Sequence, residues 1–117
     1  MPKHALVVKS DLTFEILDIA ENELSQLQSA VEGLIQPVDL AELITMWVNE
    51  EGLFQEGLEL NQLATAFMQE LGSNTPIMGN VVFTGGTDED GNTLGMNQDA
   101  MDELTEITRR AKELVFG

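Results

Sequence analysis

The sequence predicts an α+β domain in which a mixed, largely antiparallel sheet carries packed helices. Short apolar runs of strand length are separated by turn residues, and three longer segments repeat apolar residues at helical spacing. These elements follow one another in the order β-β-α-β-β-α-β-α. The chain has 117 residues, of which 43% are hydrophobic, so residues 1–117 are expected to form a single domain with a buried core.

The first two predicted elements are strands that form a hairpin. Apolar runs at His4–Val8 and Thr13–Ile19 flank Ser10 and Asp11, and these two residues are typical of a short loop between strands. The second run leaves open which side chains face the core. Phe14, Ile16 and, after a bulge, Ile19 form one possible inner face, and Leu17 belongs to the opposite face.

The next segment is predicted to be a helix followed by two strands. Glu21–Gly33 has helical periodicity and stops at a glycine. Its predicted apolar face consists of Leu24, Leu27 and Val31. Leu34–Val38 contains Pro37, so it is expected to be an edge strand or a bent strand. Leu43–Val48 is expected to be a central strand.

The second half of the chain is predicted to contribute two helices with a strand between them. The first of these helices ends near Gly72, and its apolar face consists of Leu63, Ala64, Phe67, Met68 and Leu71. Ile77–Thr84 is rich in β-branched residues and predicts a strand, and Thr87–Asn92 predicts a turn. The last helix has Asn97 as its N-cap. Its apolar face consists of Met101, Leu104, Ile107, Thr108, Ala111 and Leu114.

The charge of the chain is strongly negative and unevenly distributed. The net charge is −16, and the 99 residues from Ser10 to Thr108 contain 20 of the 21 acidic residues and no lysine or arginine. Nucleic acid is therefore an unfavourable ligand, because phosphate binding needs cations. A basic protein surface or a divalent cation would be attracted instead. Acidity that only maintains solubility is the alternative explanation.

An acidic segment after the predicted central strand resembles a family signature. It reads Val48-Asn49-Glu50-Glu51-Gly52, followed by Gly57-Leu58, Asn61 and Ala64. With "ALVV" near the start and "GNVVFTGGTDEDG" before the last helix, it is similar to an uncharacterised family of small acidic proteins, encoded mostly by bacteriophages and other mobile elements. The resemblance covers nearly the whole chain. It implies a phage or mobile-element setting and assigns no activity.

The residues of this acidic segment divide into a structural group and a binding group. The structural group shapes the loop and caps the helix that follows, and it consists of Asn49, Gly52, Gly57, Asn61 and Ala64. These roles leave the acidic residues unexplained. The candidate partner-binding residues are therefore Glu50, Glu51, Glu56 and Glu59. Trp47, just before the segment, is expected to belong to the core.

No arrangement of residues predicts an enzyme. The chain has no cysteine and no tyrosine, and His4 is its only histidine. Gly85 and Gly86 are not followed by the lysine of a phosphate loop. The calcium-loop pattern can be aligned on Gly91, but its first ligand and its final glutamate are then replaced by Gly86 and Asn97. We expect no catalytic residue, no metal site and no cofactor.

These observations favour a non-enzymatic accessory protein that binds a basic surface of a host protein, with DNA mimicry or an anti-defence role as one form. A module that binds a small ligand or a divalent cation in its acidic loops is one alternative, and a structural or assembly protein is another. Ala5–Val8 is too short for a signal sequence or a membrane span, so a cytoplasmic protein without a membrane partner is expected. The oligomeric state is left open.

Overall fold

The computed structural model describes residues 3–117 and contains eight elements in the predicted order. They are β1 (His4–Val8), β2 (Phe14–Asp18), α1 (Glu23–Val31), β3 (Ile35–Ala41), β4 (Ile44–Asn49), α2 (Gln62–Glu70), β5 (Val81–Thr84) and α3 (Gln98–Phe116). The strands form one sheet in the order β2-β1-β5-β4-β3, in which neighbours are antiparallel. The predicted α+β class is confirmed.

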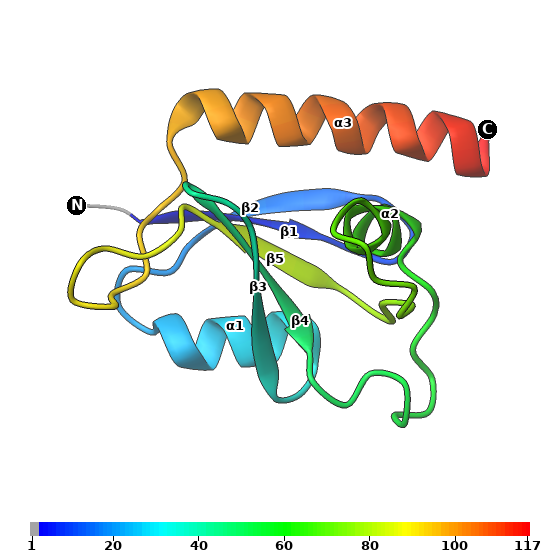
Figure 1. Ribbon diagram of the computed structural model, residues 1–117, viewed down its shortest axis with the longest axis horizontal. Helices are drawn as coiled ribbons and strands as arrows, with labels where there is room; N and C mark the ends of the chain where they lie inside the picture. Colours follow the sequence, from blue (N-terminus) through cyan, green and yellow to red (C-terminus); the bar gives the residue numbers. More distant parts are fainter. Residues whose placement is uncertain (1–2) are drawn as a thin grey trace.

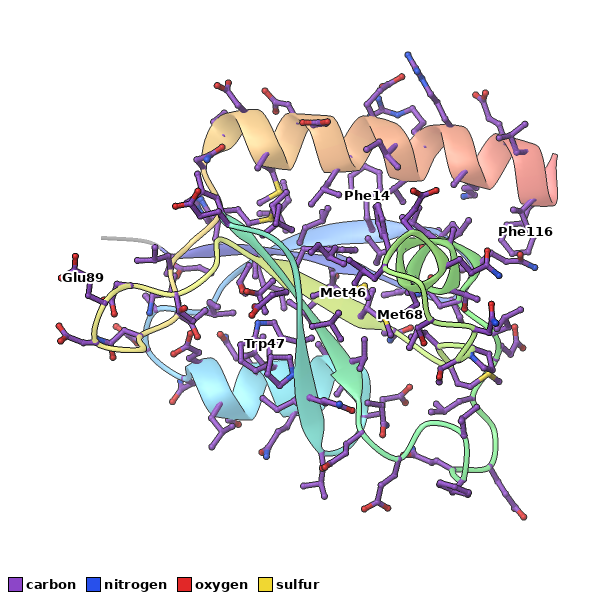
Figure 2. All side chains as sticks on the ribbon, viewed as in Figure 1. Phe14, Met46, Trp47, Met68, Glu89 and Phe116 are labelled. Carbon is purple, nitrogen blue, oxygen red and sulfur yellow. The ribbon has the colours of Figure 1, made fainter. Side chains whose placement is uncertain are left out.

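The sheet separates two apolar layers. α1 covers one face, and α2 and α3 cover the other (Figure 1). Alternate side chains of a strand point to opposite faces. On β4, Met46 therefore packs on the side of α2 and α3, whereas Trp47 packs on the side of α1 (Figure 2). Trp47 is half-buried, as expected for a core residue beside a sheet edge, and its Nε1 donates to Thr84 Oγ1 at 2.9 Å.

The inner strands are buried on both faces, and the outer strands are partly exposed. Ala5–Val8 of β1 and all of β5 are buried, because helices cover them from both sides. β3 contains Pro37 and an irregular register between Asp39 and Ala41, both of which are typical of an edge strand. The predictions of an edge strand followed by an interior strand are therefore confirmed.

The end of α1 differs from the prediction that Gly33 stops this helix. Glu32 has the left-handed backbone with φ 64°, and its N–H donates to Ser29 O at 3.3 Å. The backbone therefore leaves the helix one residue earlier. Gly33 has a different role, because a Cβ at this position would lie 2.7 Å from Asn49 Nδ2.

Three leucines that were predicted to be buried are exposed. Leu24, Leu71 and Leu114 are 61%, 49% and 88% exposed. Leu71 follows the last residue of α2. Leu114 lies in the final turns of α3, next to the C-terminus (Figure 1), and residues 112–117 are all exposed. The predicted strand Ile77–Thr84 is also shorter and begins at Val81, after Gly79 at φ 86°. None of the helices in residues 3–117 is long and apolar enough to cross a membrane.

Candidate functional site

The acidic loop, residues 50–59, joins β4 to the segment before α2 and is anchored at its start by Asn49. The Asn49 side chain is buried, and its Nδ2 donates to Val31 O at the end of α1 and to Gln55 Oε1, both at 3.0 Å. Its Oδ1 accepts from the backbone N–H of Glu51 at 2.9 Å. Asn49 therefore does more than form a turn, because one amide joins β4, α1 and the loop.

The middle of the loop is fastened by Gln55, and two glycines allow its shape. Gln55 Nε2 donates to Glu32 O at 3.1 Å, which fastens the loop to the end of α1 a second time. Gly52 is buried, and a Cβ there would lie 3.3 Å from Met78 O. Gly57 has φ 87°, a conformation that side chains with a Cβ rarely adopt. The structural roles predicted for the two glycines agree with this geometry.

The end of the loop is fixed by Asn61, the N-cap of α2. Asn61 Oδ1 accepts from Ala64 N at 3.0 Å, as the sequence predicts, and Ala64 is buried in the core. The amide also donates from Nδ2 to Val8 O at 3.3 Å and to Gly79 O at 3.0 Å. Asn61 is 0% exposed, so all three bonds are shielded from water.

The four glutamates of the loop are exposed and carry no ion pair among residues 3–117. The pairs found there join Lys3 to Glu23 at 3.8 Å, and Arg109 and Arg110 to Glu106 at 2.8 and 3.1 Å. Glu50, Glu51, Glu56 and Glu59 therefore keep their charges uncompensated at the surface. Their carboxylates lie along one short loop that Asn49 and Asn61 hold at its two ends.

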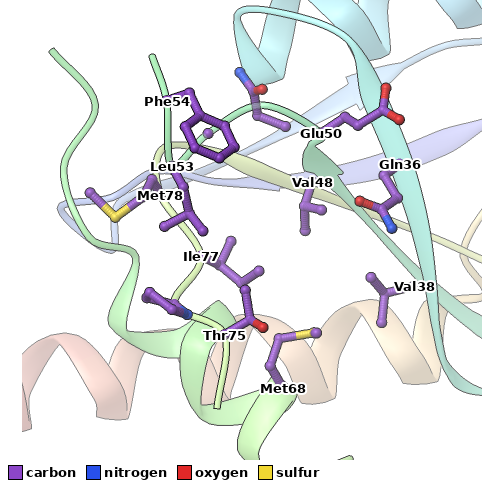
Figure 3. Close-up of a pocket in the computed structure, with 13 residues that line it drawn as sticks. Gln36, Val38, Val48, Glu50, Leu53, Phe54, Met68, Thr75, Ile77 and Met78 are labelled. Atoms are coloured by element: carbon purple, nitrogen blue, oxygen red, sulfur yellow. The ribbon is translucent and has the colours of Figure 1, made fainter. Parts of the chain in front are cut away.

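A groove lies beside the acidic loop, between β3 and residues 75–78. We call it the loop groove; its volume is about 200 Å³. Its lining is largely apolar and includes Val38, Val48, Met68, Ile77 and Met78. Figure 3 shows Leu53 and Phe54 of the loop at one end and Met68 of α2 at the other. Leu53 is 54% exposed and Phe54 is 88% exposed, so the loop presents apolar side chains among its glutamates.

The sequence predicted the glutamates of the acidic loop as candidate residues and missed the apolar residues beside them. Leu53 and Phe54 stand between two acidic pairs and could have been found as apolar residues in a loop that is otherwise polar. Met68 and Met78 could not be assigned to the groove, because they come from separate segments. Gln55 was missed because its partners, Asn49 and Glu32, are brought to it by the fold.

The second acidic turn, residues 87–92, is organised by Asp88. Its Oδ1 accepts from the backbone N–H groups of Asp90 and Asn92, both at 2.9 Å. The hydrogen bond from the Asn92 backbone lowers the pKa of Asp88, because it stabilises the charged carboxylate. In the described part of the chain, no group of three or more histidine, aspartate or glutamate side chains is arranged to hold a metal ion.

The comparisons with known proteins place the chain in a family of unknown function. The family model described as a domain of unknown function (DUF3846) matches residues 2–109. No curated protein and no solved structure matches the chain. Since the matched residues span nearly the whole sequence, the chain belongs to this family of domains of unknown function.

Proposed function

We propose that this protein is a non-enzymatic accessory factor that binds a basic surface of another protein through the acidic loop. Glu50, Glu51, Glu56 and Glu59 supply the charge, and Leu53 and Phe54 supply apolar contact area. In the setting that the family resemblance implies, a phage or another mobile element, the partner is a protein of the host cell and the complex forms in the host cytoplasm.

The observation that carries this proposal is the uncompensated charge of a firmly held loop. A flexible chain that carries exposed charges loses conformational entropy when it binds, and this loss weakens binding. Here Asn49, Gln55 and Asn61 connect the loop backbone to α1, β1 and the residues before β5. Binding therefore orders mainly the glutamate side chains, so more of the electrostatic attraction is retained.

DNA mimicry is one form of the proposal. Carboxylates would replace phosphates in the nucleic-acid groove of a host nuclease, polymerase or repressor. The net charge of −16 and the absence of lysine and arginine from Ser10 to Thr108 support it. A mimic competes with DNA, so addition of duplex DNA should release the partner from this protein.

The proposal is tested by capturing host proteins on the immobilised chain at low and at moderate salt. We expect a partner that is captured at low salt, released by salt, and not captured by a variant with glutamine at positions 50, 51, 56 and 59. Capture that is equal for the wild type and this variant would reject the acidic loop as the binding site. Capture of no protein, together with a bound small molecule, would favour the ligand-binding alternative.

The uncompensated charge also leads to a prediction on stability. We expect the melting temperature to rise when NaCl is increased from about 0.01 M to about 0.1 M, because the screening length falls from about 30 Å to about 10 Å and repulsion among the carboxylates weakens. Differential scanning calorimetry measures this shift. Magnesium or calcium chloride at matched ionic strength is the control. A shift larger than that with NaCl would indicate a specific cation site and support the divalent-cation alternative.

A charge-reversal pair tests whether the position of the charge matters. Glu56→Lys with Glu59→Lys should lower the association rate with the captured partner by about tenfold, because steering depends on the local field. Surface plasmon resonance measures the rate. Glu89→Lys with Glu113→Lys is the matched control, since both glutamates are exposed and Glu89 lies in the turn at the opposite end of the molecule (Figure 2).

Asp18 is unsuitable as a control for charge reversal. Its Oδ1 accepts from the backbone N–H groups of Lys3 at 3.1 Å and of Ala20 at 3.0 Å, so its replacement would also disturb the fold. Equal rate losses for the loop pair and the control pair would show that only the net charge matters. The acidic loop would then be a solvated connection between β4 and α2.

A further inference from the structure

A second groove follows the loop groove along β3 and α2. It has a volume of about 210 Å³ and is lined by Leu40 and Ile44 of the sheet, Phe67 and Leu71 at α2, and Leu104 and Ile107 of α3. The loop groove is bordered by Val38 of β3 and Met68 of α2. The two hollows thus occupy successive positions along the same two elements. Together we call them the β3 groove.

The β3 groove exists because α2 and α3 cover the sheet incompletely. Val38 and Leu40 pack toward the α2–α3 side and are only partly buried. On the inner strands β1 and β5, Leu6 and Phe83 point to the same side and are 0% exposed. The layer of helices therefore ends before it reaches the outer strand, and space for a further element remains over β3.

The rim of the β3 groove is acidic. Glu50 borders the loop groove, and Glu70 and Glu103 border the second hollow; all three are exposed. Among residues 3–117, no lysine, arginine or histidine lines either hollow. Exposed apolar side chains stand near both ends, namely Phe54 at 88% and Leu71 at 49% exposure. An apolar floor with an acidic rim is complementary to an apolar stripe flanked by basic residues.

We propose that the β3 groove binds an amphipathic helix of the partner protein, with apolar residues at positions i, i+3, i+4 and i+7 and lysine or arginine beside them. The three residues 36, 38 and 40 alone extend over about 13 Å of strand. With Phe54 and Leu71 beyond them, a helix of about 14 residues, or about 21 Å, matches the groove. This inference rests on the proposed function, because Glu50 and Phe54 belong both to the acidic loop and to the groove.

The test uses the ¹⁵N-labelled full chain and a synthetic peptide of about 14 residues, with leucine at the four stated positions, lysine beside them and alanine elsewhere to favour the helix. A scrambled peptide of the same composition is its control. We expect the amphipathic peptide to shift the amide signals of β3, residues 52–54 and residues 67–71. The scrambled peptide should bind at least about tenfold more weakly, since it offers charge without an apolar stripe.

Two pairs of exposed leucine or phenylalanine residues locate the binding. Phe54→Ala with Leu71→Ala should weaken binding of the amphipathic peptide by about tenfold or more, because both side chains border the groove. Leu24→Ala with Leu114→Ala should leave it unchanged. Both of those leucines are exposed, one on α1 and the other in the last turns of α3, away from the groove lining.

The outcomes separate this inference from the proposed function. Equal binding of both peptides, signal shifts outside the groove, or equal losses for both alanine pairs would reject the groove as a helix site. The salt-sensitive capture that depends on the four glutamates would then still stand. Groove signals that shift with protein concentration alone would identify a second copy of the chain as the occupant and also overturn the inference. Equal capture of a host protein by the wild type and the glutamine variant, together with intact peptide binding, would reject the proposed function instead.

Discussion

Asn61→Ala should lower the free energy of unfolding by about 3 kcal/mol or more. Loss of the cap to Ala64 N costs about 1 kcal/mol in most proteins. Asn61 is 0% exposed, and its Nδ2 also donates to Val8 O and Gly79 O. The alanine side chain cannot donate to these two buried carbonyls. Each lost bond should cost about 1 kcal/mol or more in the free energy of unfolding. Urea unfolding followed by circular dichroism measures the loss.

Asn97→Ala is the matched control for this prediction. Asn97 caps α3 through one bond from Ala100 N at 2.8 Å, and its side chain is exposed. Its replacement should therefore cost only about 1 kcal/mol. Losses of the same size at both positions would show that the bonds from Asn61 to β1 and Gly79 contribute little.

The site has a buried structural part, Asn49 and Asn61, and an exposed part, the four glutamates. Asn49 and Asn61 are buried and bind the backbone of distant elements. The four glutamates between them are exposed and form no ion pair among residues 3–117. Substitution of the asparagines should change stability, and substitution of the glutamates should change association. A loss of stability in the glutamine variant would show that the glutamates have a structural role.

The role of Asn61 could be predicted from the sequence only in part. An asparagine directly before a helical apolar pattern is a local signal, and it identified the N-cap. The bonds to Val8 and Gly79 span 53 and 18 residues, so no local pattern reveals them. The same limit explains Gly33, which looked like a helix stop but leaves room for Asn49.

Helical periodicity predicted which side of each helix is apolar, but not which residues on that side are buried. Leu24 and Leu114 fit the spacing of their helices, yet they are exposed, because burial depends on whether another element packs against that turn of the helix. The β3 groove has the same origin. Its floor combines β3, α2 and residues 75–78, and the uncovered strip over β3 follows from the packing of helices on the sheet.

Gly85→Ala is expected to have an effect as large as that of Asn61→Ala. The backbone at Gly85 runs against residues 94–95, with Gly85 N donating to Leu94 O at 2.8 Å. A Cβ on Gly85 would lie 2.1 Å from Gly95 O, and backbone cannot move aside as a flexible side chain can. We expect a loss of about 3 kcal/mol or more in the free energy of unfolding, at the upper end of the cost of overpacking.

Gly91→Ala, in the same connection between β5 and α3, is the control for Gly85→Ala. Gly91 has φ 82°, and no atom of residues 3–117 lies within 4 Å of an added Cβ, so only the backbone preference is lost, at about 1 kcal/mol. A larger loss at Gly85 than at Gly91 would show that Gly85 is required for the close approach of two backbone segments. This role explains Gly85 without a phosphate ligand. Equal small losses would mean that residues 94–95 can move, and this role of Gly85 would be rejected.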